Sequence, residues 1–194
     1  MIFNILISGV GGQGTVLASK LIAGAAIECG FDVRTTETIG MAQRGGSVVG
    51  HTRIGDNIAS PLILPGGADL LIAFEPSEAV RQLSFLSAEG TLIVCDKGVT
   101  PLTYALLGQI YEADKLVDYI KANIGKAIIV PGQPIIKQHA KMLNVALLGV
   151  AAQSGVFPFE TQALGSVISK MPKFREENLE AFEIGRNIYN ESIN

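Results

Sequence analysis

The fold is decided by the stretch Ser8-Gly9-Val10-Gly11-Gly12-Gln13-Gly14-Thr15, which follows the apolar run Ile5-Leu6-Ile7 and precedes a helical pattern that begins near Val16. This order predicts a buried strand, a tight glycine turn and the first turn of a helix. Glycine suits such a turn because it tolerates positive φ and lets backbone N–H groups or a neighbouring element approach closely. The free N–H groups at the start of the helix would favour an anion such as a phosphate or a carboxylate.

Two interpretations of this turn stay open on residue chemistry. In the first, Gly9, Gly11 and Gly14 form the dinucleotide-binding pattern G-x-G-x-x-G, and Glu37 stands where nucleotide-binding enzymes place the acid that holds the ribose hydroxyls. The chain would then be a stand-alone oxidoreductase that binds NAD(P) or FAD. In the second, the glycines only let the first helix pack closely on the sheet, and the chain is a scaffold for assembly.

Strand and helix patterns alternate and predict one α/β domain over residues 1–194, a Rossmann-like, mostly parallel sheet flanked by helices with a helical C-terminal segment. After the first strand, further strands are expected at 33–37, 47–54, 69–74, 91–95 and 127–130. Beyond the helix that follows the glycine turn, further helices are expected at 78–85, 115–123, 141–153, 160–171 and 176–190. We expect strand 33–37 to pair in parallel with the first strand through a right-handed crossover.

Composition excludes several functional classes. The net charge is −3, and the scattered basic residues argue against a nucleic-acid partner. No apolar run approaches the roughly 18 residues that a membrane span requires. The first strand follows Met1 at once, which predicts no leader segment and a cytoplasmic protein. The two cysteines, Cys29 and Cys95, are too few for an iron–sulfur cluster, and neither they nor His51 and His139 form a metal-binding pattern.

No catalytic residue is predicted, because the patterns G-x-S-x-G, H-E-x-x-H and G-K-[ST] are absent. A second glycine loop, Arg44-Gly45-Gly46, lies between two expected strands. Its backbone could approach a ligand or another subunit, and the guanidinium could bind a carboxylate or a phosphate. The alternative is a solvated turn.

Four motifs, taken together, resemble one family. They are the turn Gly9-x-Gly11-Gly12-Gln13-Gly14, the loop Arg44-Gly45-Gly46-Ser47 before a strand that ends near Arg53, the segment from Asn144 to Gly149, and Asn178-x-x-Ala181-Phe182-x-x-Gly185. This set is similar to the gamma subunit, or gamma domain, of 2-oxoacid:ferredoxin oxidoreductases over nearly the whole chain. Within that family, the small size and the sequence Met-Ala-Gln before Arg44 most resemble the beta subunit of the indolepyruvate enzymes.

The resemblance implies an accessory subunit that is active only in a complex. The complex would decarboxylate a 2-oxo acid oxidatively, reduce ferredoxin and form an acyl-CoA. Thiamine diphosphate, magnesium and the iron–sulfur clusters would be held mainly by a large partner subunit. Related gamma domains are associated with coenzyme A binding, so coenzyme A is the cofactor contact that the resemblance implies for this chain. The residues that would border the shared cleft or bind a cofactor are Gly9, Gly11, Gly12, Gln13, Gly14, Thr15, Arg44, Gly45, Gly46 and Ser47.

Overall fold

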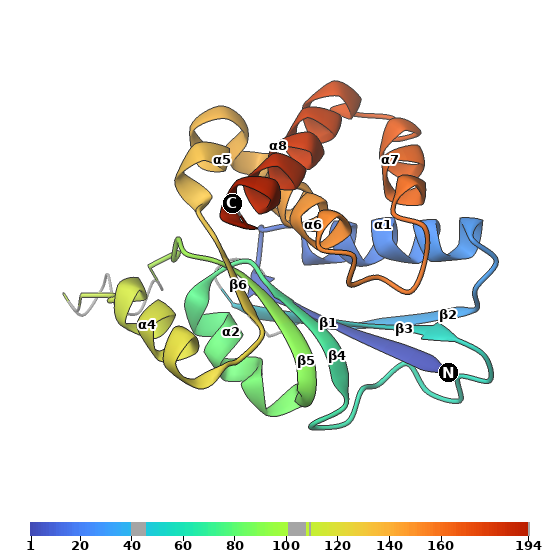
Figure 1. Ribbon diagram of the computed structural model, residues 1–194, viewed down its shortest axis with the longest axis horizontal. Helices are drawn as coiled ribbons and strands as arrows, with labels where there is room; N and C mark the ends of the chain where they lie inside the picture. The colour runs from blue at the N-terminus through green and yellow to red at the C-terminus, as the bar shows by residue number, and fades with distance from the viewer. Residues whose placement is uncertain (40–45, 101–107, 109, 194) are drawn as a thin grey trace.

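The computed structural model describes residues 1–39, 46–100, 108 and 110–193. Figure 1 shows a twisted sheet between two layers of helices, with α2 and α4 on one face and α1, α5, α6, α7 and α8 on the other. The elements are β1 (Ile2–Val10), α1 (Thr15–Glu28), β2 (Val33–Ile39), β3 (Ser47–Gly55), β4 (Ala68–Ala73), α2 (Pro76–Gln82), η1 (Leu83–Phe85), β5 (Leu86–Cys95), α4 (Ala113–Asn123), β6 (Ala127–Val130), α5 (Gly132–His139), η2 (Ala140–Met142), α6 (Leu143–Gln153), α7 (Gln162–Ser169) and α8 (Arg175–Ile193). The α/β class, the predicted strands and the C-terminal helices are confirmed.

In the described residues, the strands form one sheet in the order β2-β3-β1-β4-β5-β6. Strands β1, β4, β5 and β6 pair in parallel, whereas β3 lies between β2 and β1 and is antiparallel to both. The predicted parallel pairing of 33–37 with the first strand is therefore wrong. The connection from β2 to β3, residues 40–46, is shorter than the dozen or more residues that a parallel crossover needs, so β3 pairs antiparallel with β2. Strand β3 also pairs with β1 and thereby separates β2 from it.

The centre of the sheet is buried on both faces. In β1, Ile5 and Ile7 pack into the core cluster under α1 and α6, whereas Leu6 packs into the cluster that includes Ala79 of α2 and Ile120 of α4. This alternation follows from the two-residue period of a strand. It explains why the central strands are continuous apolar runs, as is typical of parallel strands covered by helices on both sides.

The backbones of helices α6 and α8 are in direct contact. A Cβ atom added to Gly185 would lie 1.9 Å from the carbonyl oxygen of Ala146, and one added to Gly149 would lie 2.0 Å from that of Phe182. Two of the motifs that carry the family resemblance therefore contain the glycines of a helix–helix contact. Packed between α8 on one side and α1 and β5 on the other, α6 is almost completely buried, as its uniformly apolar sequence predicts.

Cys95, His51 and His139 each make contacts within the fold. Cys95 is fully buried, and burial raises the pKa of its thiol to about 11, so it stays protonated at neutral pH. His51 is buried in β3, where its Nδ1 atom accepts a hydrogen bond of 3.2 Å from the amide of Ile63, and burial lowers its pKa. His139 contacts Glu180 at 3.1 Å. The described residues contain no group of three or more His, Cys, Asp or Glu that could hold a metal ion.

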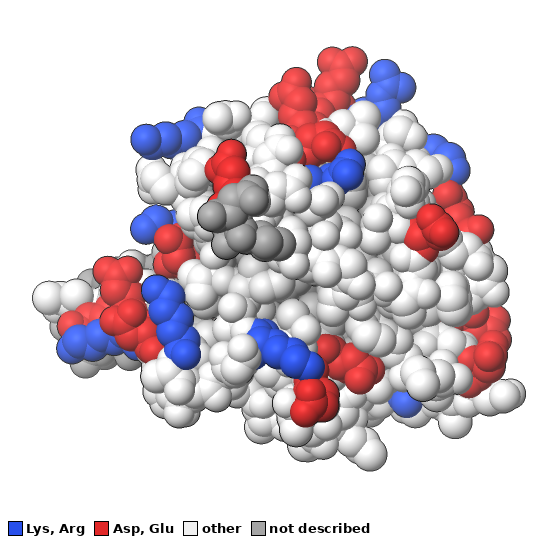
Figure 2. All heavy atoms as spheres, viewed as in Figure 1, with Lys and Arg blue, Asp and Glu red and all other residues white. Residues whose placement is uncertain are grey.

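The surface agrees with the charge pattern of the sequence. Figure 2 shows acidic and basic side chains interspersed, with no extended basic area on the face in view. No helix in the described part of the chain is both long enough and apolar enough to cross a membrane.

Candidate functional site

The candidate site lies at the carboxyl ends of β1 and β4. These strands are parallel neighbours, but α1 leaves β1 toward one face of the sheet and α2 leaves β4 toward the other (Figure 1). Ligands of open α/β sheets bind at such a switch point, because the diverging connections leave a crevice. The antiparallel β3 begins at the same edge, so that the amide of Gly11 donates to the carbonyl oxygen of Gly46 at 2.8 Å.

The glycine turn has the conformation that its sequence predicts. Gly12 and Gly14 have φ angles of 104° and 81°, in the left-handed region that glycine adopts without strain. The amide of Gln13 donates to the carbonyl oxygen of Val10 at 3.0 Å and closes the turn. The amides of Gly11 and Gln13 are thus engaged inside the protein, whereas Gly12 is exposed.

The turn leads into α1 without a side-chain cap. Gly14 occupies the N-cap position, and the first turn of the helix carries no acidic residue, so the positive end of the helix dipole is not neutralised locally. Asn144 of α6 holds this junction, because its Nδ2 atom donates to the carbonyl oxygen of Gly14 at 3.1 Å. The Oδ1 atom of the same buried side chain has no partner among the described residues.

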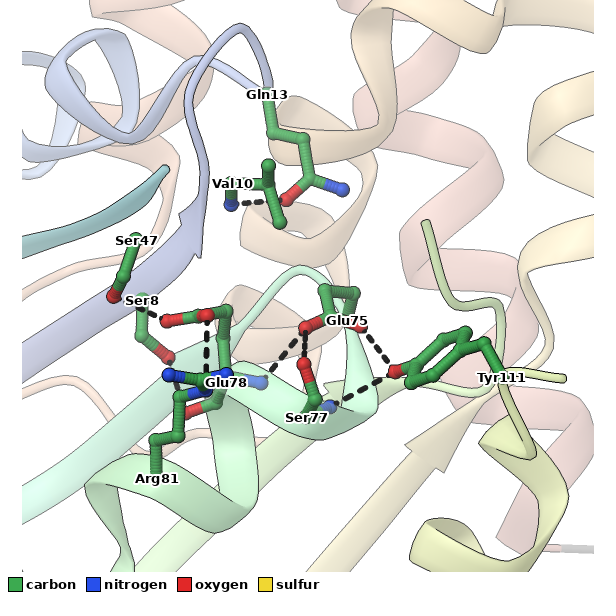
Figure 3. A network of polar contacts seen from close by, with 9 residues as sticks. All are labelled: Ser8, Val10, Gln13, Ser47, Glu75, Ser77, Glu78, Arg81 and Tyr111. Carbon is green, nitrogen blue, oxygen red and sulfur yellow. Dashed lines mark hydrogen bonds and ion pairs between the residues drawn. The ribbon is translucent and has the colours of Figure 1, made fainter. Parts of the chain in front are cut away.

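A network of buried acids lies beneath the turn, at the start of α2 (Figure 3). Glu75 is fully buried and caps α2, since its Oε1 atom accepts from the amide of Glu78 at 2.8 Å and from the hydroxyl of Ser77. Its Oε2 atom accepts from the hydroxyl of Tyr111 at 2.5 Å. One carboxylate thereby holds both the helix start and the segment before α4.

Glu78 connects α2 to two strands. Its Oε2 atom accepts from the Ser47 hydroxyl at 2.5 Å, and its main-chain oxygen accepts from the Ser8 hydroxyl at 3.4 Å. Its Oε1 atom lies 3.4 Å from Nε of Arg81, whose side chain is 63% exposed, so this ion pair contributes little. Burial raises the pKa of Glu78, and the hydrogen bond from Ser47 and the charge of Arg81 only partly oppose that shift.

Replacing this acid by its neutral isostere tests the cost of the buried charge. Because the folded-state pKa of Glu78 is raised above 4.5, its contribution to stability is full below pH 4.5 and is lost as the pH rises through the folded-state pKa. Glu78→Gln removes this titration and keeps an oxygen for Ser47. We expect the variant to be more stable than wild type at pH 7, by about 1 kcal/mol, and this difference to shrink toward pH 4.5.

Urea unfolding of both proteins from pH 4.5 to 8 measures that difference. A Glu78→Gln variant that is less stable at pH 7 would contradict the prediction, because the charged hydrogen bond would then outweigh the cost of burial.

The structure brings eight of the predicted site residues together and separates Glu37 from them. The residues that meet at this edge of the sheet are Gly9, Gly11, Gly12, Gln13, Gly14, Thr15, Gly46 and Ser47. Arg44 and Gly45 lie outside the described residues. Glu37 pairs with Gly50, and the whole width of β3 separates it from β1, so it does not occupy the position of a ribose-binding acid.

Sequence reasoning missed Glu75, Glu78, Tyr111 and Asn144. A signal for the first two was present, because the sequence Glu75-Pro76-Ser77-Glu78 directly after a buried strand is typical of a capped helix start at the carboxyl edge of a sheet. Tyr111 is distant in the sequence and carries no such signal, whereas Asn144 opens one of the family motifs but was not assigned to the site.

Comparisons with known proteins identify the family. Residues 4–188 match the model of the family described as pyruvate ferredoxin/flavodoxin oxidoreductase. The indolepyruvate oxidoreductase subunit IorB of Archaeoglobus fulgidus is 37% identical, with 100% of this chain and 96% of the relative covered. The protein of the same name from Pyrococcus horikoshii is 30% identical, with coverage of 99% and 98%.

Solved structures have the same fold. A keto/oxoacid ferredoxin oxidoreductase gamma subunit from Geobacter sulfurreducens has a TM-score of 0.65 at 22% identity and covers 97% of this chain and 99% of its own. The 2-oxoglutarate:ferredoxin oxidoreductase of Magnetococcus marinus has a TM-score of 0.70 at 20% identity, over 98% of this chain and 31% of that one. The predicted resemblance and the prediction of a small oxidoreductase subunit are confirmed. The chain belongs to the pyruvate ferredoxin/flavodoxin oxidoreductase family.

Proposed function

We propose that the chain is the gamma-type subunit of an indolepyruvate:ferredoxin oxidoreductase, which decarboxylates an aryl 2-oxo acid oxidatively, forms an acyl-CoA and passes electrons to ferredoxin. The observation that carries this proposal is the similarity to IorB subunits at 30–37% identity over essentially the whole length of both proteins. Because the similarity extends from the glycine turn to α8, it includes the candidate site and not only the sheet.

The redox cofactors belong to a large partner subunit in this proposal. A cluster of iron and sulfur takes about four thiolates, and this chain has two cysteines, of which Cys95 is buried with a raised pKa. The pattern that holds the metal and the diphosphate of thiamine, Gly-Asp-Gly followed by Asn-Asn, is likewise absent from the sequence. The residues of this chain therefore do not fit these groups.

Coenzyme A is the cofactor that fits the carboxyl edge of the sheet. Its phosphates would face the uncapped start of α1 and the exposed Gly12, where no acidic side chain lies in the first helical turn. Ser47 and Gly46 border the same edge, and Arg44 and Gly45 precede them in the sequence. The thiol of coenzyme A accepts the acyl group in the reaction, and this chain would supply only binding contacts to it.

Reconstitution of the complex tests the proposal. The chain is purified alone and after co-expression with a large subunit that carries clustered cysteines and a thiamine site. We expect the pair to co-purify and to reduce ferredoxin with indolepyruvate and coenzyme A, and the lone chain to show no turnover. Turnover by the lone chain, or the absence of a stable pair, would contradict the proposal, and tight binding of NAD, NADP or FAD to the lone chain would favour a nucleotide enzyme instead.

A further inference from the structure

The side chain of Gln13 is clamped onto β1. Its Oε1 atom accepts a hydrogen bond of 2.7 Å from the amide of Val10, and the main-chain N–H of Gln13 donates to the carbonyl oxygen of Val10 at 3.0 Å. A backbone N–H can only face an acceptor, so the oxygen of the side-chain amide must be the inner atom and Nε2 the outer one. Figure 3 shows this nitrogen directed away from Val10.

The glycines of the turn make room for this arrangement. A Cβ atom on Gly9 would lie 2.9 Å from the Oε1 atom of Gln13 and 2.9 Å from Cδ2 of Phe74. Any side chain at this position would therefore push Gln13 off the strand. The left-handed Gly12 and Gly14 on either side of Gln13 give the turn its shape. The motif thus fixes a side-chain amide in one orientation before any ligand binds.

The Nε2 atom of Gln13 is available to a ligand. It has no hydrogen-bond partner among the described residues, although the side chain is half-buried at the switch point between β1 and β4. The acids drawn nearby in Figure 3 accept hydrogen bonds from other donors, Glu75 from Tyr111 and Glu78 from Ser47. A hydrogen bond from a fixed, partly desolvated donor contributes more to affinity than one from a mobile donor, because the fixed donor loses no conformational entropy on binding.

We propose that Gln13 is a binding residue, whose Nε2 atom donates a hydrogen bond to an acceptor oxygen of the reacting molecules in the assembled enzyme. The proposal rests on the proposed function. The acceptor is a carbonyl or carboxylate oxygen of the 2-oxo acid, or an amide or phosphate oxygen of coenzyme A. All of these oxygens accept a hydrogen bond from a neutral N–H donor in the same way. Kinetic measurements must therefore distinguish the 2-oxo acid from coenzyme A.

The decisive variant is Gln13→Glu, measured in the complex with the large subunit. It keeps an oxygen facing the amide of Val10 and replaces the outward nitrogen by an oxygen that repels an acceptor. We expect kcat/KM to fall at least tenfold for one of the two molecules. A rise of KM for the 2-oxo acid alone assigns the contact to the substrate, and a rise of KM for coenzyme A alone assigns it to the coenzyme.

Two further variants isolate the lost donor. Gln13→Met removes the donor together with the acceptor of the Val10 amide, without adding charge, and should show a loss for the same molecule. Gln162→Glu, on the exposed first turn of α7, introduces the same charge away from the turn and should leave both kinetic constants at the wild-type values. Thermal unfolding of the free chains shows whether each variant is folded.

The proposal is overturned if a folded, assembled Gln13→Glu complex has wild-type kinetic constants for both molecules. It is also overturned if the folded variant fails to assemble, because Gln13 would then contact the partner subunit. The proposed function fails separately, since in that case the wild-type pair itself shows no turnover.

Discussion

Gly185→Ala is expected to destabilise the chain by about 3 kcal/mol or more, or to prevent folding, because overpacking costs most where backbone rather than a flexible side chain must move. The added Cβ atom would stand 1.9 Å from the carbonyl oxygen of Ala146 and 3.1 Å from the amide nitrogen of Val150. Helix α8 would have to move away from α6. Since Asn144 of α6 holds the start of α1, the displacement would reach the glycine turn as well.

A matched glycine-to-alanine substitution in another helix is expected to change the stability in the opposite direction. Gly165 lies inside α7, and a Cβ atom there would meet nothing within 4 Å. Gly165→Ala should therefore stabilise the chain, by up to about 1 kcal/mol, through helix propensity alone. Urea unfolding of the two variants and wild type measures both effects. A Gly185→Ala protein as stable as Gly165→Ala would show that α6 and α8 do not pack backbone to backbone.

Glu75→Ala is expected to cost about 2–4 kcal/mol, the sum of a lost helix cap and of two half-buried hydroxyl groups that lose their acceptor. Glu75 is fully buried, and its two oxygens accept from the amide of Glu78 and from the hydroxyls of Ser77 and Tyr111. No alanine atom can replace these acceptors. The loss should release both the start of α2 and the segment around Tyr111.

An exposed acid with a short ion pair is the control. Glu89 lies 2.8 Å from Nζ of Lys126, but its side chain is 87% exposed, so Glu89→Ala should leave the stability close to that of wild type. Chemical denaturation gives the free energies, and hydrogen exchange shows whether protection is lost at α2 first. Equal effects of the two substitutions would mean that Glu75 is no more than a surface charge.

Short-range sequence patterns predict most of the secondary structure of the chain. The run Ile5-Leu6-Ile7 followed by glycines suffices to predict β1, the turn and α1, because strand burial, positive φ and the helix start are each decided by neighbours in sequence. The uniformly apolar segment after Asn144 likewise predicts a buried helix. The family resemblance followed from four such local motifs in order.

The pairing of the strands was decided only by the tertiary structure. An alternating pattern shows that β3 is a strand, but not that it is inserted beside β1, because the choice of neighbour depends on burial across the whole sheet and on the reach of the connection. That insertion separates Glu37 from the glycine turn and brings Ser47 to it.

Some features of the candidate site follow from the sequence, and others exist only in the folded chain. The sequence by itself determined a glycine turn between a strand and a helix, because the residues that require it are adjacent. Only the folded chain decided that Gln13 lies back on Val10, that Glu75 meets Tyr111 and that Asn144 holds Gly14. Two of these three contacts join residues 36 and 130 positions apart, and all three depend on space and hydrogen-bond partners that exist only once the helices have packed on the sheet.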